Sequence, residues 1–185
     1  CMDLAHQFAV DVNNQDIQTL ASSLKGRDDM ETTKNILKWI NINIAYDPAV
    51  SVSYCFEEKA SDVLKSRKGD CVSKTRLASA LLRANSIETR SVGGCLLRKN
   101  VCSTVFSILP SEQIPTSYLQ DNKKRGDLHE WLEININGKW YQAEATAGIL
   151  YEESCNNYLV LGYDTNSYDR CTITDNSFVA QCKVA

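Results

Sequence analysis

The chain has 185 residues, of which 43% are hydrophobic and 23% are charged, and its formal net charge is −3 at pH 7. This length and composition fit one globular domain with a full hydrophobic core, so we expect residues 1–185 to form a single domain. The negative charge does not favour nucleic-acid binding, and no apolar run approaches the roughly 18 residues of a membrane helix.

Eight cysteines are many for an intracellular protein of this size, and none forms the C-x-x-C pair of common zinc sites. The chain begins with Cys1 rather than Met, which suggests the lipidated first residue of a bacterial-type lipoprotein. If Cys1 is lipidated and Cys71 has a catalytic role, six cysteines remain for three disulfides: Cys55, Cys95, Cys102, Cys155, Cys171 and Cys182. We therefore expect an extracytoplasmic protein, either secreted, periplasmic or anchored through Cys1. A reduced protein with buried cysteines is the alternative.

The first part of the chain has helical patterns. Residues 16–24 are weakly helical, and Asp28 with its neighbour Asp29 provides an N-cap for a helix over about residues 30–43. Ser61 is expected to cap a further short helix.

The strongest helical pattern covers residues 71–84, which are rich in Ala and Leu and follow Gly69 and Asp70. Cys71 opens this helix, where free backbone N–H groups and the helix dipole favour a thiolate, the attacking form of cysteine. The same N–H groups could stabilise an oxyanion. A cysteine that only packs in the core is the alternative.

A strand is expected over residues 89–92, ending at Gly93 and Gly94. The region from residue 98 to residue 127 has no clear pattern, and a loop of that length in a compact domain is often functional. Beyond Gly148 the patterns are weaker, with strands expected at residues 158–162 and 171–174.

The clearest local signal is a β-hairpin, in which residues 128–136 alternate, Asn137 and Gly138 form a two-residue turn, and residues 139–146 return.

This hairpin predicts which side chains lie together. A two-residue turn places His129 opposite Thr146 and Trp131 opposite Glu144, so Glu144 is a diagonal neighbour of His129 on the same face. Such neighbours lie roughly 7–8 Å apart, and a carboxylate there could hold one imidazole nitrogen and leave the other for a thiol. Asp127 is a reserve candidate for this acid. A surface hairpin with one polar pair is the alternative.

Three segments, in this order, resemble the transglutaminase-like superfamily. They are residues 68–84, which contain Gly-Asp-Cys; residues 129–133, His-Glu-Trp-Leu-Glu; and residues 140–146, Trp-Tyr-Gln-Ala-Glu-Ala-Thr. The family pattern is a G-D-C or G-N-C helix start, an H-x-W-x-E strand and a W-x-x-x-D-x-T return strand. The matching region runs from about residue 33 to residue 148, which we expect to be a catalytic core between an N-terminal helical extension and a C-terminal extension.

The resemblance implies an α+β fold with a papain-like, transglutaminase-like core, in which the nucleophile helix packs on an antiparallel β-sheet. It implies that Cys71 is the nucleophile and His129 its base, while Glu144 stands where the family carries Asp. Tyr46 is the candidate for an aromatic residue near the oxyanion, with a buried core tyrosine as the alternative. Trp131 is expected in the same oxyanion and substrate region.

The resemblance also implies acyl transfer through a thioester. We expect a cysteine hydrolase, either a peptidase or an amidase or isopeptidase, acting on a protein or peptide. Microbial relatives include isopeptidases that act on cell-wall peptides, which suggests that substrate. A protein-glutamine transglutaminase and an inactive binding module are the alternatives. The chemistry requires no metal or organic cofactor. Asp164, Asn166 and Asp169 favour a solvated turn over a calcium loop.

Overall fold

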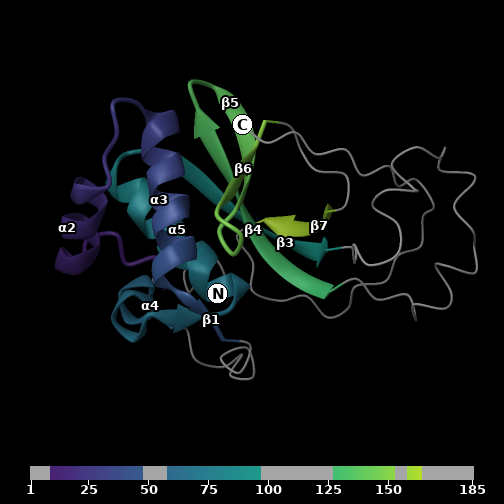
Figure 1. The fold of residues 1–185 in the computed structure, drawn as a ribbon. Coiled ribbons are helices and arrows are strands. Elements are labelled where there is room, and N and C mark those ends of the chain that lie inside the picture. The colour runs from purple at the N-terminus through teal and green to yellow at the C-terminus, as the bar shows by residue number, and fades with distance from the viewer. Residues whose placement is uncertain (1–8, 48–57, 97–126, 153–157, 164–185) are drawn as a thin grey trace, which may run out of the picture.

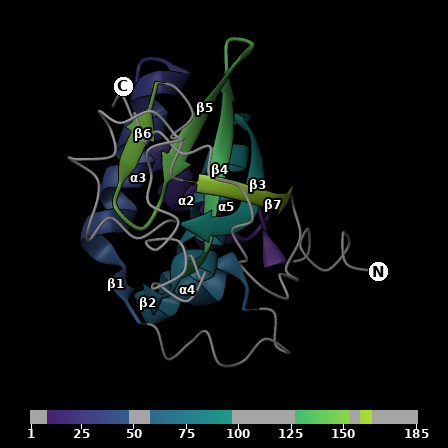
Figure 2. The ribbon, with the colours of Figure 1, turned by 90° about the vertical axis from the view of Figure 1, so that its right-hand side faces the viewer.

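The structure is a computed structural model that describes residues 9–47, 58–96, 127–152 and 158–163. Its helices gather on one side of an antiparallel sheet, as the two views in Figures 1 and 2 show. The expected α+β class is therefore confirmed.

The larger sheet has five strands in the order β6-β5-β4-β3-β7, and every neighbouring pair is antiparallel. The strands are β3 (Glu88–Leu96), β4 (Asp127–Ile136), β5 (Lys139–Glu144), β6 (Ile149–Tyr151) and β7 (Tyr158–Tyr163). The central strand β4 is thus joined to β5 by the short hairpin and to β3 across a long stretch of chain. This arrangement brings the residues from 127 onward next to those that end at residue 96.

Helix α5 (Cys71–Ala84) lies at the centre of the molecule, packed against β3 and β4 and contacted by the other helices. These are α2 (Gln15–Ser23), α3 (Asp29–Asn43) and α4 (Ala60–Ser66). Leu77, Leu81 and Leu82 of α5 are fully buried, and they meet Leu132 and Ile134 of β4 in one hydrophobic cluster. Because this helix is buried on nearly every side, its first residue has little freedom of position.

The helix starts and stops largely follow the expected capping chemistry. Asp28 caps α3 by accepting a hydrogen bond from the backbone N–H of Glu31, and Asn85 is the C-cap of α5. Ser61, however, is not a cap. It lies buried inside α4, and its backbone N–H donates to the carboxylate of Asp11, so the expectation for Ser61 is wrong.

Strand β3 also differs from expectation, because it does not end at Gly93 and Gly94 but continues to Leu96. The pairing of β3 with β7 shifts register between these two glycines. They therefore mark a bulge inside the strand rather than its end. Strand β6 and the two-residue strands β1 (Ala45–Tyr46) and β2 (Lys68–Gly69) were not predicted.

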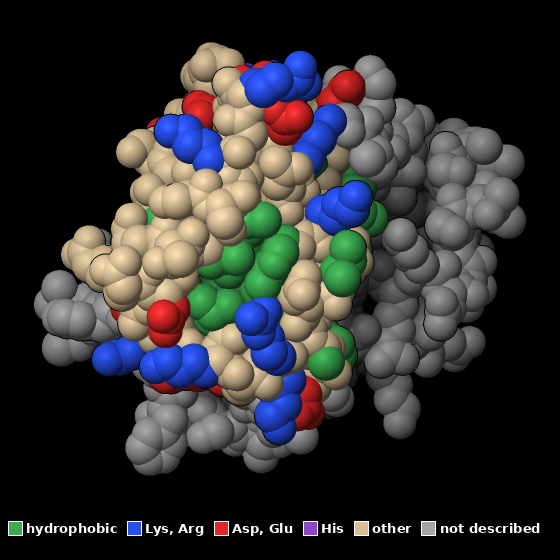
Figure 3. Space-filling model, turned by 60° about the vertical axis from the view of Figure 1, so that its left-hand side comes forward, with side chains coloured by type: hydrophobic (Ala, Val, Ile, Leu, Met, Phe, Trp, Pro, Cys, Tyr) green, Lys and Arg blue, Asp and Glu red, His purple; other side chains and the backbone are tan. Residues whose placement is uncertain are grey.

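One face of the helical side carries a patch of hydrophobic side chains with Lys and Arg nearby, and no described histidine reaches the surface there (Figure 3). None of the described helices is long and apolar enough to cross a membrane.

The turn after β5 joins the sheet to α3 through a close backbone approach at Gly148. Gly148 has φ +71°, and a Cβ atom there would lie 2.8 Å from Cβ of Asn41 and 3.2 Å from the carbonyl oxygen of Leu37. Gly138 in the hairpin has φ +82°, but a Cβ atom there would meet nothing within 4 Å. Both glycines therefore have a positive φ that would strain a residue with a side chain, and they differ in crowding.

We expect Gly148→Ala to lower the free energy of unfolding by about 3 kcal/mol, because it adds a clash to the strain of a positive φ. The matched control, Gly138→Ala, should lower it by about 1 kcal/mol from strain alone. Urea unfolding of both variants measures the difference. Equal losses would contradict the close approach of this turn to α3.

Candidate active site

Cys71 is a free, half-buried thiol at the first residue of α5. The residue before it, Asp70, caps the helix by accepting a hydrogen bond of 2.9 Å from the backbone N–H of Ser73. A Cβ atom at Gly69 would lie 2.4 Å from Cβ of Ser73, so only glycine lets the chain pass this close to the first helical turn. The local sequence therefore sets the thiol at the positive end of a helix dipole.

His129 lies in β4 with its imidazole between two partners. Its Nε2 is 2.5 Å from Oε2 of Glu144, and the ring also makes a side-chain hydrogen bond with Cys71. The two side chains of the His129–Glu144 pair are only 10% and 5% exposed. With Nε2–H donating to the carboxylate, the other ring nitrogen is the one left for the thiol. The structure thus brings all three expected residues together.

Glu144 is the last residue of β5, and both of its carboxylate oxygens are engaged. Oε2 accepts from His129, while Oε1 accepts a hydrogen bond of 2.9 Å from the backbone N–H of Thr146. The carbonyl of Thr146 in turn accepts from Nδ2 of Asn41 in α3, at 3.0 Å. The position of the acid is therefore tied to both the sheet and α3.

The register of β4 and β5 explains why the carboxylate of Glu144 is within hydrogen-bond reach of His129. Leu132 pairs with Ala143, which places Glu144 opposite Trp131 and diagonal to His129, as the turn predicted. Glu133 lies on the same face but pairs with Arg90, whose Nε donates to it at 2.6 Å. Asp127 begins β4, and its side chain lies outside the described residues.

The electrostatics of the site favour a charged imidazole. Burial by itself lowers the pKa of His129, but the hydrogen bonds to Cys71 and Glu144 and the charges of these two groups outweigh it and raise the pKa to about 10. At neutral pH the ring is then an imidazolium. An imidazolium beside a thiol at a helix N-terminus is the setting in which cysteine ionises to a thiolate.

Trp131 and Tyr46 differ in their surroundings. Trp131 is 1% exposed, and its ring stacks beside that of His129 with centroids 6.3 Å apart and planes inclined by 21°. Tyr46 is 54% exposed, so it is not a buried core residue, and it pairs with Gly69, two residues before Cys71. Both lie beside the candidate site, and their expected roles in substrate or oxyanion binding stay predictions.

Lys74, whose burial was not predicted, is 2% exposed and lies about one helical turn after Cys71. Burial lowers the pKa of this lysine, and the charge of Glu144 opposes that effect. The available signal was its spacing of three residues from the cysteine on the same helix.

Other predictions concern parts of the chain that the structure does not describe. They include the loop from residue 98 to residue 127, the suggested anchor at Cys1, the strand at residues 171–174 and the turn around Asp164. The side chains of the six cysteines expected to form disulfides are also outside the described residues. Within the described ranges, no group of three or more His, Cys, Asp or Glu residues could hold a metal ion.

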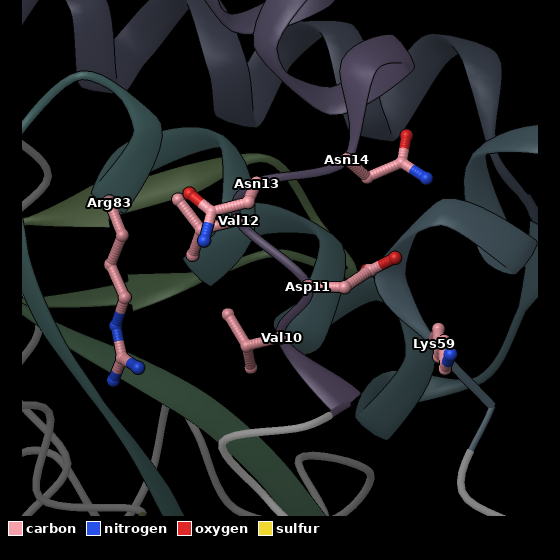
Figure 4. Close-up of a pocket in the computed structure, with 7 residues that line it drawn as sticks. All are labelled: Val10, Asp11, Val12, Asn13, Asn14, Lys59 and Arg83. Carbon is pink, nitrogen blue, oxygen red and sulfur yellow. The ribbon is translucent and has the colours of Figure 1, made fainter.

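A separate hollow of about 480 Å³ lies among residues 10–14, Lys59 and Arg83. Figure 4 shows Arg83 and Lys59 on its opposite sides. The guanidinium of Arg83 donates to the hydroxyl and carbonyl oxygens of Thr89, which ties α5 to the start of β3. None of the residues gathered around His129 lines this hollow.

The fold resembles those of two solved structures. One is a proposed cysteine protease from Cytophaga hutchinsonii, with a TM-score of 0.57 and 21% identity; the match covers 84% of this chain and 43% of that one. The other is a proposed protease from Parabacteroides distasonis, with a TM-score of 0.50 and 14% identity, covering 77% and 25%. At these identities the likeness concerns the fold.

Two comparisons concern the sequence itself. The UPF0252 protein MJ1282 of Methanocaldococcus jannaschii is 35% identical over 78 residues, which cover 38% of this chain and 22% of that protein. This chain therefore spans less than half the length of that relative and of each of the two solved structures. The family model of the transglutaminase-like superfamily matches residues 18–145. This chain therefore belongs to the transglutaminase-like superfamily, a family of cysteine-dependent enzymes.

Proposed function

We propose that this chain is a cysteine hydrolase that cleaves a peptide or isopeptide amide bond through a thioester intermediate. The observation that carries the proposal is the continuous contact from Cys71 through His129 to Glu144. This is the arrangement that nucleophilic catalysis requires: a nucleophile, a base in hydrogen-bond contact with it, and a group that orients the base.

In the first half of the reaction, the thiolate of Cys71 attacks the amide carbonyl and a bond forms between sulfur and carbon. The tetrahedral oxyanion collapses, the carbon–nitrogen bond breaks, and the leaving amine takes a proton from the imidazolium of His129. The products are a free amine and a thioester on Cys71. Glu144 holds the ring in one tautomer and stabilises its charged form throughout.

In the second half, His129 takes a proton from water as the water attacks the thioester. The sulfur–carbon bond breaks, a carboxylic acid leaves, and the thiolate and imidazolium are restored. If the amine of a lysine attacks in place of water, the product is a new amide and the enzyme is a transglutaminase. The residues of the triad serve both reactions equally.

The oxyanion would be stabilised by the backbone N–H of Cys71 at the helix start and by Tyr46, whose strand is paired with the segment leading to Cys71. Trp131 would support the ring of His129 and border the substrate. A peptide substrate fits the two structural neighbours, which are proposed proteases. A cell-wall peptide is the substrate we expect within that class.

Activity can be tested with a mixed peptide library that includes γ-glutamyl and ε-lysyl isopeptides, with and without a fluorescent primary amine. We expect amide cleavage to a free acid, little incorporation of the amine, and no turnover by Cys71→Ala, which keeps a residue suited to a helix start. Mass spectrometry identifies both classes of product. Amine incorporation that exceeds hydrolysis would assign the chain as a transglutaminase instead. A lack of either product in the wild type would favour the inactive binding module.

The rate of Cys71 alkylation tests the contact with His129 without a substrate. We expect iodoacetamide to modify Cys71 faster than the other cysteines at pH 7, because the raised pKa of His129 keeps an imidazolium beside the sulfur. His129→Ala should slow this reaction. Peptide mapping resolves Cys71 from the other cysteines. If another cysteine labels faster while Cys71 stays inert, the assignment of nucleophile and base is wrong.

Variants of Glu144 test the departure from the family pattern, which carries Asp at this position. Glu144→Gln should lower turnover by as much as about 10⁴-fold, because a neutral amide neither fixes the tautomer nor stabilises the imidazolium. Glu144→Asp should keep part of the activity, since the charge survives and the family carries Asp at this position. Asp127→Asn is the control for the reserve candidate and should stay near wild type. If Glu144→Gln stays active while Asp127→Asn does not, the orienting acid is Asp127.

A further inference from the structure

An asparagine on α3 reaches the turn that follows the acid of the candidate site. Asn41 is an exposed residue in the last turn of α3, and its Nδ2 donates a hydrogen bond of 3.0 Å to the carbonyl oxygen of Thr146. The two residues are 105 positions apart in the chain. This contact therefore belongs to the tertiary structure, and it joins a helix that contributes no member of the triad to the end of β5.

Thr146 passes this contact on to the carboxylate. Its backbone N–H donates to Oε1 of Glu144 at 2.9 Å, and Oε2 of the same carboxylate is bonded to Nε2 of His129. Asn41 thus holds the backbone of Thr146 at its carbonyl, while the N–H of that residue holds the acid. A continuous run of three hydrogen bonds leads from the side chain on α3 to the imidazole.

Gly148 makes room for the asparagine. A Cβ atom at this glycine would lie 2.8 Å from Cβ and 3.2 Å from Cγ of Asn41. The N–H of Gly148 also donates to the carbonyl oxygen of Glu144 at 2.8 Å, which closes the turn on itself. The turn is therefore compact, and α3 lies close enough for the side-chain amide to reach it.

The identity of the acid explains what this support does. Glu144 stands where the family carries Asp, and glutamate has one more rotatable side-chain bond. A longer side chain loses more conformational freedom when its carboxylate is fixed, so its orientation depends more on the contacts that hold it. Here one oxygen is held by the turn and the other meets the ring of His129. A small displacement of the turn would therefore move the acid relative to the base, and such displacements lower rates strongly.

We propose that Asn41 is a positioning residue, which fixes the backbone of Thr146 and thereby holds the carboxylate of Glu144 against His129. This inference rests on the proposed function in one respect, namely that Glu144 orients the base. It does not depend on the substrate or on whether water or an amine resolves the thioester.

The first test is kinetic and uses the peptide that the wild type cleaves fastest in the library. We expect Asn41→Ala to lower kcat by about 10-fold with little change in KM, because one hydrogen bond that orients the acid is lost. Alanine is the better helix former, so α3 itself should not be weakened. Asn41→Gln keeps an amide donor and should recover part of the loss.

Asn43 provides the matched control. It is also an exposed asparagine of α3, but its Nδ2 donates within the helix, to the carbonyl oxygen of Trp39 at 2.8 Å. Asn43→Ala should keep kcat near that of the wild type. An equal loss in both alanine variants, or a rise in KM with kcat unchanged in Asn41→Ala, would overturn the positioning role.

A double-mutant cycle shows whether Asn41 acts through the acid. If it does, removing Asn41 has nothing further to disturb once the carboxylate is gone. The double variant Asn41→Ala/Glu144→Gln should then be about as slow as Glu144→Gln alone. If the two losses multiply, Asn41 acts elsewhere and the inference is wrong.

Amide hydrogen exchange, measured by NMR on the whole chain, tests the same link without a substrate. We expect the N–H of Thr146 to exchange about 10-fold faster in Asn41→Ala than in the wild type, and at the wild-type rate in Asn43→Ala. Unchanged protection of Thr146 in Asn41→Ala would overturn the inference. If the wild type cleaves no amide, the proposed function fails, and this exchange rate still decides whether Asn41 holds the turn beside Glu144.

Discussion

The hydrogen bond between His129 and Glu144 is the contact on which the candidate active site depends. It exists because Asn137 and Gly138 close the hairpin with a two-residue turn and thereby set which residues of β4 and β5 lie opposite each other. A shift of one residue would carry one partner to the other face of the sheet, since side chains alternate along a strand. A turn at the far end of the hairpin therefore controls the geometry of the site.

A different constraint, the packing of α5, places the thiol of Cys71 beside the imidazole of His129. The apolar side chains of this helix are buried against β4, and its start is held by the cap at Asp70 and by the close approach of Gly69. Helix and sheet meet through the same hydrophobic core that stabilises the fold. The relative position of Cys71 and His129 is thus a consequence of packing, and the hydrogen bonds add orientation to it.

Much of the fold and of the candidate site was predictable from the sequence because it depends on local chemistry. The cap at Asp28, the extent of α5, the hairpin turn and the diagonal placement of Glu144 follow from short-range rules, and the structure agrees with each. The predictions were wrong where tertiary contacts determine the local structure. Ser61 looks like a cap but is the second residue of α4, and its N–H donates to Asp11, fifty residues earlier.

The unpredicted elements have a similar origin. The strands β1 and β2 contain two residues each and exist only because two distant segments pair, so neither leaves a periodic pattern. The burial of Lys74 and the exposure of Tyr46 likewise depend on how the helices and strands pack, which residue type alone does not reveal. The sequence therefore predicted that Cys71, His129 and Glu144 lie together in the candidate site, and it did not predict what surrounds them.

The central claim is that His129 carries a proton because it lies between the sulfur of Cys71 and the carboxylate of Glu144. Nitrogen-15 NMR of the imidazole at pH 7, with His6→Gln to leave a single histidine, measures this directly. We predict a doubly protonated ring that loses its proton only near pH 10. A neutral ring at pH 7, titrating near the ordinary histidine pKa of about 6.5, would contradict it.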